Sequence, residues 1–116
     1  MFDIFDNNWI RITCRDSATI AITLKDSDGE PFEIGEEESV IFTVMTKKEK
    51  TVITKVLTIA SVDPDDPTII NCELDSNDTD LTTGEYLYDC LFIDSNGQRT
   101  TFISSVFQIL PAVGER

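Results

Sequence analysis

The sequence predicts an all-β fold, an antiparallel Greek-key β-sandwich of about seven strands. Apolar and polar residues alternate in short runs separated by turns rich in Gly, Pro, Asp and Asn, as in half-buried strands. No segment keeps a helical period beyond one or two turns. The 116 residues have the size of one domain. We therefore expect a single domain over residues 1–116, with its core at about 9–110 and a tail or linker at 111–116.

The first two expected strands are residues 9–14 and 18–25, and both alternate with period two. Their inward side chains are Ile10, Ile12, Cys14, Ile20, Ile22 and Leu24. A turn follows, because Asp28-Gly29 suits positive φ and Pro31 cannot donate to a strand ladder.

Residues 39–46 and 51–59 are the next two expected strands, joined by a basic tip. Four of the nine basic residues gather here and form a candidate partner-docking group: Lys47, Lys48, Lys50 and Lys55. Such a group could steer docking to an acidic partner. Protection of an edge strand from pairing with other chains explains an inward-leaning Lys55 equally well.

The last three expected strands share the alternation and are residues 68–74, 85–93 and 98–110. Between the first two of these, a polar stretch is expected to hold one helical turn capped by Asp75 or Ser76. The length of the final strand and the apolar residues on both of its faces predict either burial or a bulge near Ser104-Ser105.

Residues 81–97 carry the most specific local signals in the chain. Six of them are expected to have structural roles: Leu81, Gly84, Tyr86, Tyr88, Asn96 and Gly97. The spacing L-x-x-G-x-Y places Tyr86 to form the tyrosine corner of immunoglobulin-like sandwiches, and Tyr88 continues its inward face. The Asn-Gly pair predicts a hairpin with a type I′ turn, in which both central residues have positive φ.

The net charge of −13 argues against binding to nucleic acid and to anionic membranes, because both need Lys and Arg. No run approaches the ~20 apolar residues of a membrane helix. The N-terminus carries Asp3 and Asp6 and lacks a basic region, so we expect no secretory signal in this sequence. A signal removed from a precursor stays open.

The chain has no His, which removes Ser-His and Cys-His nucleophilic sites, so we expect no enzyme and no cofactor. Carboxylate pairs of the glycosidase type stay open among the 22 acids, but nearly all of these acids lie in turns. Cys14, Cys72 and Cys90 lie in apolar strands and are expected to be buried free thiols in a reducing compartment. A bridge between Cys72 and Cys90 is the alternative.

Two acidic loops are weak candidates for a calcium site, with oxygen ligands from Asp63, Asp65, Asp66, Asp75, Asn77, Asp78 and Asp80. Calcium takes about six to eight oxygen ligands. Solvated turns explain the same residues. The Asp26-x-Asp28-x-Glu30 run fails as an EF-hand, because Pro31 stands where that loop needs Gly. Asn77 begins a glycosylation sequon, which without a signal peptide we take as chance.

Five blocks follow one another in a fixed order from about Trp9 to Leu110. They are Arg15-Asp16-Ser17-Ala18-Thr19 before an I-x-I-x-L strand, Asp26-Ser27-Asp28-Gly29-Glu30-Pro31, Val40-Ile41-Phe42-Thr43-Val44 before a basic hairpin, L-x-x-G-x-Y-x-Y-D at 81–89, and D-x-N-G at 94–97. This order resembles the immunoglobulin-like N-terminal modules of phage and prophage baseplate upper proteins and related tail proteins.

The resemblance implies a non-catalytic structural module of a tail or baseplate that binds other virion proteins. Such a module is made in the bacterial host cytoplasm and ends in the virion, and it leaves open a homo-oligomer formed through sheet edges. The alternative is an extracellular immunoglobulin-like binding module, for carbohydrate or adhesion, with calcium stabilising its acidic loops. That alternative favours a surface cluster of aromatic residues, and Trp9 is the one Trp in the sequence.

Overall fold

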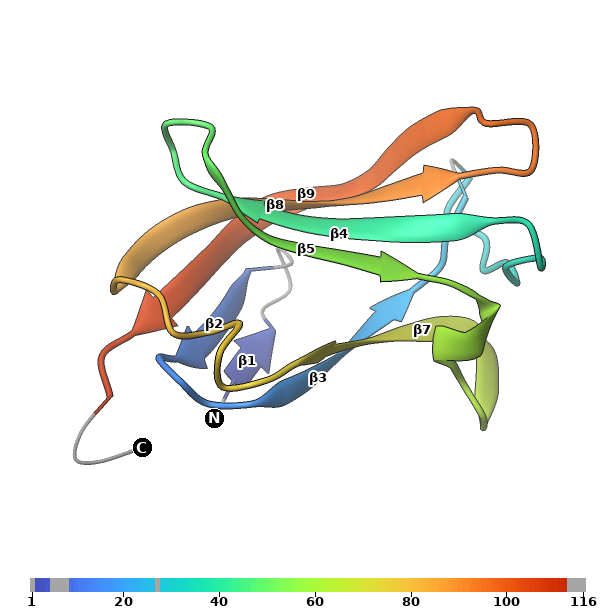
Figure 1. The fold of residues 1–116 in the computed structure, drawn as a ribbon. Helices are drawn as coiled ribbons and strands as arrows, with labels where there is room; N and C mark the ends of the chain where they lie inside the picture. The colour runs from blue at the N-terminus through green and yellow to red at the C-terminus, as the bar shows by residue number, and fades with distance from the viewer. Residues whose placement is uncertain (1, 5–8, 27, 113–116) are drawn as a thin grey trace.

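The computed structural model describes residues 2–4, 9–26 and 28–112, in which nine strands form two sheets packed face to face (Figure 1). The larger sheet has the order β1-β2-β9-β8-β4-β5, and the smaller has the order β3-β7-β6. The strands are β1 Phe2–Ile4, β2 Ile10–Thr13, β3 Ala18–Thr23, β4 Ser39–Met45, β5 Thr51–Leu57, β6 Val62–Asp63, β7 Asp66–Leu74, β8 Gly84–Ile93 and β9 Arg99–Leu110. In these described ranges the one helical element is a 3-10 turn, η1 Ile59–Ser61.

The predicted all-β, immunoglobulin-like sandwich is confirmed. The seven predicted strands correspond to β2, β3, β4, β5, β7, β8 and β9, and the short β1 and β6 were not predicted. The chain passes from one sheet to the other after β2, β3, β5 and β7. All pairings are antiparallel except that of β2 with β9, which is parallel. The expected tail falls partly on residues 113–116, which lie outside the described residues.

The core lies between the sheets and is built from the predicted inward faces. Ile20, Ile22 and Leu24 from the smaller sheet are buried, and they face apolar residues of the larger one. At its centre the Phe42 ring lies 5.5 Å from that of Tyr88, and the Phe107 ring lies 6.3 Å from Phe42 and 6.4 Å from Tyr88. Edge and tilted ring pairs at such distances stabilise a core beyond the area that they bury.

The tyrosine corner that the sequence predicts is present. The hydroxyl of Tyr86 donates to the carbonyl oxygen of Thr82 at 2.6 Å, and the residue is 8% exposed. Gly84 has a φ of 141°, a region that other residues rarely adopt, and this lets the chain turn sharply into β8. Leu81 packs against the core beside it. The corner fixes where β8, the central strand of the larger sheet, begins.

The Asn-Gly hairpin between β8 and β9 has a different turn from the predicted type I′. Gly97 has a φ of 83°, but Asn96 does not have positive φ. The carboxylate of Asp94 accounts for this, because its Oδ1 accepts from the backbone amides of Asn96 and Gln98, each at 2.9 Å. These bonds hold a longer loop with one left-handed residue, the kind that ends in a bulged Gly.

The loop between β4 and β5 has the same arrangement of a side chain that accepts backbone bonds and one left-handed residue, but the left-handed residue is not a Gly. Thr46 Oγ1 accepts from the Lys50 amide at 3.1 Å, and the Glu49 amide donates to the Thr46 carbonyl at 2.9 Å. Glu49 takes the left-handed position, with a φ of 66°. A side chain in this conformation clashes with its own backbone, so Glu49 stores strain.

The bulge predicted near Ser104 lies at Phe102 instead. Cys90 pairs with Ile103 and Leu91 pairs with Thr101, so the larger sheet has one extra residue in β9 between them. A bulge redirects the side chains around it. Here it brings Phe102 to the same side as Ile103, between the two sheets.

The three cysteines are free thiols, and the alternative bridge between Cys72 and Cys90 is not formed. Both of these are buried, and burial raises the pKa of each thiol to about 12. The prediction of burial is wrong for Cys14, which is half-buried because it lies just beyond β2 against the β7–β8 loop.

Replacing Tyr86 with Phe should lower the free energy of unfolding by about 1–3 kcal/mol while keeping the fold. The loss comes from the bond to Thr82 and from leaving that carbonyl unpaired. Denaturant unfolding of the variant and the parent protein measures the difference, and circular dichroism checks the fold. An unchanged midpoint would show that the bond contributes nothing.

Replacing Glu49 with Gly should raise the free energy of unfolding by about 0.5–1 kcal/mol. Relief of the left-handed strain contributes ~1–2 kcal/mol, and the greater freedom of Gly in the unfolded chain takes back part of it. The matched control, Glu49→Ala, keeps a Cβ at the strained position and should show no gain. A Gly variant that unfolds at lower denaturant than the parent contradicts the assignment of strain.

Candidate ligand-binding cleft

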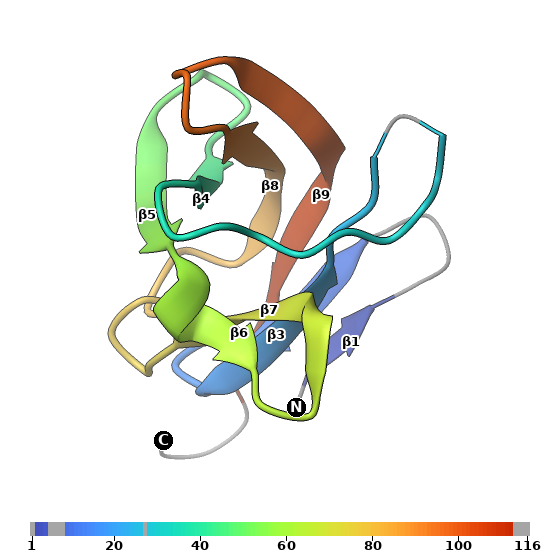
Figure 2. The same cartoon turned by 90° about the vertical axis from the view of Figure 1, so that its right-hand side faces the viewer.

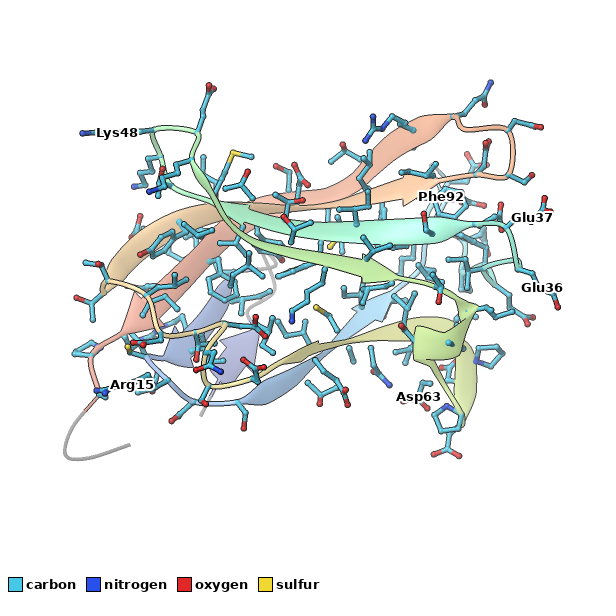
Figure 3. All side chains as sticks on the ribbon, viewed as in Figure 1. Arg15, Glu36, Glu37, Lys48, Asp63 and Phe92 are labelled. Carbon is cyan, nitrogen blue, oxygen red and sulfur yellow. The ribbon has the colours of Figure 1, made fainter. Side chains whose placement is uncertain are left out.

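An open cleft of about 780 Å³ lies at one end of the sandwich. Three segments that are distant in sequence meet there: the end of β8, the start of β9, and the crossing segment, residues 24–38, which joins β3 to β4. Figure 2 shows the crossing segment running over this end of the molecule. In Figure 3, Phe92 lies at the end that carries Glu36 and Glu37, and Lys48 lies at the opposite end.

Phenylalanine rings form the apolar part of the cleft. Phe92 is the last inward residue of β8, where it lies beyond the buried core and is half-exposed. Phe32 comes from the crossing segment, which is held beside β3 by a 3.0 Å bond from the Phe32 amide to the Leu24 carbonyl. The two rings meet edge to face, with centroids 5.1 Å apart.

Phe102 completes the aromatic cluster because of the bulge in β9. In a regular strand Phe102 and Ile103 would point to opposite faces. The bulge sets both toward the gap between the sheets, and Phe102 borders the cleft as well. Neither Phe32 nor Phe102 was singled out from the sequence, because no local pattern shows which residues of a loop and a bulged strand will meet.

Polar groups surround these rings. The carboxylates are those of Asp26, Glu33 and Glu38, and one ammonium, that of Lys25, lies among them. Glu38 is fixed by a 2.6 Å bond that its Oε1 accepts from the Gly35 amide. An aromatic floor with a few placed polar groups at its rim is the usual composition of a small-ligand site.

The Asp26 carboxylate shapes the rim as well as lining it. Its Oδ1 accepts from the backbone amides of Asp28 at 2.9 Å and Glu30 at 3.0 Å. Gly29 has a φ of 79° and closes the turn through its amide, which donates to the Asp26 carbonyl at 3.0 Å. This turn returns the chain so that Phe32 reaches the cleft.

The first loop of calcium candidates uses its carboxylates within its own turn. Asp63 accepts from the Asp65 amide at 2.8 Å and from the Asn71 side chain at 3.3 Å. Asp66 accepts from both the amide and the hydroxyl of Thr68, and these two bonds lower the pKa of its carboxyl. The Asp65 side chain is exposed.

The second loop of calcium candidates forms a tight turn, in which the Thr79 amide donates to the Asp75 carbonyl at 3.3 Å. The Asp75 carboxylate accepts from the backbone amides of Asn77 and Asp78 at 2.9 and 2.8 Å. In turn, the Asp78 carboxylate accepts from the Asp75 amide at 2.9 Å. The predicted cap by Asp75 is present, but the segment that it caps is a tight turn and not a helical one. The ammonium of Lys55 lies 2.8 Å from Asp78, where a cation would have to bind. Asp80 lies 4.0 Å from the Cys14 sulfur.

Across the residues that the structure describes, no three His, Cys, Asp or Glu side chains form a group that could hold a metal ion. Within the same residues, no helix has the length and apolarity needed to cross a membrane.

The four lysines of the candidate docking group do not share one surface role. Lys55 points inward and pairs with Asp78, on the opposite side of β5 from solvent. Lys47 pairs with Glu85 at 3.0 Å on the surface. Lys48 and Lys50 are exposed at the hairpin, and Lys48 marks its tip in Figure 3.

Thr79 is a structural residue that sequence reasoning missed. It is fully buried, and its hydroxyl donates to the Asp16 carbonyl at 2.7 Å. Its own carbonyl accepts from the Arg15 amide at 3.2 Å, where Arg15 has a φ of 66°. A Thr within a polar loop carries no sequence signal of burial. The sequon that begins at Asn77 thus contains a hydroxyl committed to the fold.

Comparison with solved structures shows a likeness in fold. Among solved structures, this chain is similar to CopC from Methylosinus trichosporium OB3b, with a TM-score of 0.53 and 15% identity over 91% of this chain and 87% of that chain. No family model and no curated protein matches the chain. At this identity the likeness shows the fold alone, and the fold agrees with an immunoglobulin-like sandwich.

The predicted membership of the phage baseplate family is wrong. The fold is similar to that of CopC, and no comparison points to a phage tail. The tail-assembly function and the virion location rested on that resemblance and are corrected with it. The sequence blocks behind the resemblance are not specific to a phage family. The D-x-[DN]-G blocks form turns and the L-x-x-G-x-Y block forms the tyrosine corner, and both features can occur in any sandwich of this kind.

Replacing Lys55 with Met should lower the free energy of unfolding at neutral pH by about 1–2 kcal/mol, because it leaves the half-buried Asp78 carboxylate without its cationic partner. Lys47→Met is the matched control, since its pair with Glu85 is exposed and should change stability by less than ~0.5 kcal/mol. Equal effects of the two variants would contradict the special role of Lys55.

The Lys55 effect should also depend on pH. Burial opposes ionisation of Asp78, but the bonds from Lys55 and the Asp75 amide outweigh it and hold the pKa of Asp78 below 3.8. The bond to Asp78 raises the pKa of Lys55 above 10.5. The stabilisation is therefore present at neutral pH, lost as pH falls through the lowered pKa of Asp78, and lost as pH rises through the raised pKa of Lys55. Unfolding curves of parent and variant should converge at both extremes.

Proposed function

We propose that this protein is an extracellular immunoglobulin-like binding module, without catalytic turnover, that binds carbohydrate in the end cleft. The observation that carries the proposal is the cluster of Phe32, Phe92 and Phe102 in an open cleft rimmed by carboxylates. A surface cluster of aromatic residues is the feature that separates such a module from a purely structural domain.

Sugars suit this cleft because they have two kinds of surface. The C–H faces of a pyranose ring are apolar and pack against aromatic rings, which here are half-exposed. The hydroxyls at the ring edge donate to carboxylates, and such charge-assisted bonds are stronger than neutral ones. Glu33, which is exposed at the rim, and the hydroxyls of Thr100 and Thr101 are placed to make these bonds.

The buried thiols are compatible with an oxidising compartment, contrary to the reducing one expected from the sequence. Cys72 and Cys90 are buried, and a pKa of about 12 keeps both as thiols. A protonated, inaccessible thiol reacts slowly with oxidants.

The likeness to CopC assigns no ligand to this chain, because at 15% identity it shows the fold alone. The sequence has no His, and the described residues hold no metal-binding group. Nucleic acid and anionic membranes also lie outside the proposal, because the net charge of −13 opposes both.

A glycan array probed with the purified protein tests the proposal, followed by titration of the best ligand. Phe92→Ala and Glu33→Gln should each raise the Kd by about tenfold or more, a loss of ~1.4 kcal/mol. Glu37→Gln is the matched control, because Glu37 is an exposed carboxylate of the same segment that does not line the cleft. Thermal unfolding checks that each variant is folded.

Two outcomes would overturn the proposal. One is an array without any bound glycan. The other is a bound glycan whose Kd is the same for the parent, Phe92→Ala and Glu33→Gln, since the ligand would then bind elsewhere on the protein.

A further inference from the structure

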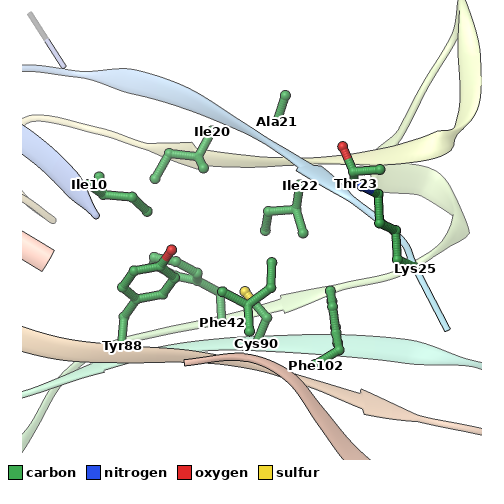
Figure 4. Close-up of a pocket in the computed structure, with 11 residues that line it drawn as sticks. Ile10, Ile20, Ala21, Ile22, Thr23, Lys25, Phe42, Tyr88, Cys90 and Phe102 are labelled. Carbon is green, nitrogen blue, oxygen red and sulfur yellow. The ribbon is translucent and has the colours of Figure 1, made fainter. Parts of the chain in front are cut away.

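A second opening lies along the side of the sandwich, next to the cleft. It is a gap of about 330 Å³ between β3 and the larger sheet (Figure 4). Ile20 and Ile22 face it from β3, and the rings of Phe42 and Tyr88 face them from the larger sheet. Phe102, set inward by the bulge, separates the gap from the cleft.

The backbone of β3 borders this gap, and among the strands that the structure describes none pairs with β3 on that side. In the order β3-β7-β6, β3 is an edge strand. The Leu24 amide donates to the carbonyl of Thr68 in β7 at 2.8 Å. Counting back two residues at a time, the backbone groups of Ile22 and Ile20 also point toward β7. Backbone groups alternate in direction along a strand, so those of Ala21 and Thr23 point away from β7.

The residue pattern supports this placement of the backbone. Ile20 and Ile22 are buried, and Ala21 and Thr23 are exposed on the outer face of the smaller sheet. Ala21 and Thr23 nonetheless line the gap. Since their side chains point to the other face, what they present to the gap is their backbone.

The opposite wall of the gap is also an unpaired edge. β2 pairs with β9 only from Phe107 to Leu110, so the first half of β9 has no partner strand on that side within the described residues. β1 lies on the far side of β2 and pairs with it, and it does not continue along β9.

The edges at β5 and β6 are protected, and the edge at β3 is not. β5 carries the inward-pointing Lys55, a charge that an added strand would have to cover. β6 has two residues and is followed by Pro64. Residues 18–23 of β3 contain no charged residue and no Pro. Unprotected edges of this kind are the ones that accept another strand.

We propose that β3 accepts an extended segment of a partner protein by strand addition, and that the segment is apolar at alternate positions and basic at one end. The backbone groups of Ala21 and Thr23 pair with the segment, and its alternate apolar side chains fill the gap against Ile22. This site adjoins the carbohydrate cleft and shares its acidic rim, but the proposal does not rest on carbohydrate binding.

Charge selects a basic segment from a different protein. Where the gap meets the cleft, the carboxylates of Asp26, Glu33 and Glu38 outnumber the ammonium of Lys25. A Lys or Arg at the end of the added strand reaches this rim. A second copy of the chain would bring a further net charge of −13, which repels the first.

The test uses a fluorescent eight-residue peptide of alternating Val and Thr with Lys at both ends, titrated against the full chain and followed by anisotropy. We expect saturable binding. Ala21→Pro should raise the Kd at least tenfold, because it removes an outward amide and leaves the bonds to β7 intact. The matched control, Ala21→Ser, keeps the amide and should leave the Kd unchanged.

Three further probes keep the test independent of how well the Pro variant folds. Peptides that are N-methylated on one set of alternate residues should fail to bind the parent protein, and those methylated on the other set should bind. Peptide binding should slow hydrogen exchange of the Ala21 and Thr23 amides at least tenfold. Replacing the terminal Lys residues with Glu should weaken binding at least tenfold.

Absence of binding at 1 mM peptide would overturn the proposal. Equal binding of both sets of N-methylated peptides would also overturn it, because the contact would then not be a strand ladder. Ala21→Pro should leave glycan binding unchanged. The peptide titration and the glycan titration therefore test the strand-addition proposal and the carbohydrate proposal separately.

Discussion

The difference in size between the two sheets is the constraint on which the rest of the structure depends. Six strands pack against three, so the smaller sheet cannot cover the whole inner face of the larger one. Apolar side chains on the uncovered part need another cover, because leaving them in water costs about 25 cal/mol per Å². At one end the crossing segment supplies it, with Phe32 set against Phe92 (Figure 2). Along the side of β3 the cover is incomplete, and the gap remains.

The bulge at Phe102 follows from the same constraint. A regular β9 would turn Phe102 to the outer face and leave a larger opening between the sheets. One extra residue instead places two apolar side chains, those of Phe102 and Ile103, on the inner side. Phe102 therefore borders both the cleft and the gap, and the bulge in β9 sets the direction of its side chain. Bulges are common beside binding sites for this reason.

The sequence predicts the fold well because that part of the information is local. Alternation along β3 and β8 identifies their buried faces, and L-x-x-G-x-Y identifies the Tyr86 bond to Thr82. The cleft could not be predicted, since Phe32 and Phe102 meet only through the crossing of the chain and the bulge. The family resemblance misled for the same reason, because its blocks describe turns and corners and not the surfaces between them.

The distribution of charge explains how an unprotected edge can persist. An edge strand without Lys or Pro invites pairing between copies, and β3 is such a strand. A net charge of −13 makes copies of this protein repel one another, and at physiological ionic strength this repulsion acts over about 8 Å. The edge of β3 is therefore protected by the charge of the whole protein and not by a charged residue in the strand. Repulsion acts on acidic partners alone. An edge protected in this way is closed to the protein itself and open to a basic strand, whereas Lys55 closes β5 to both.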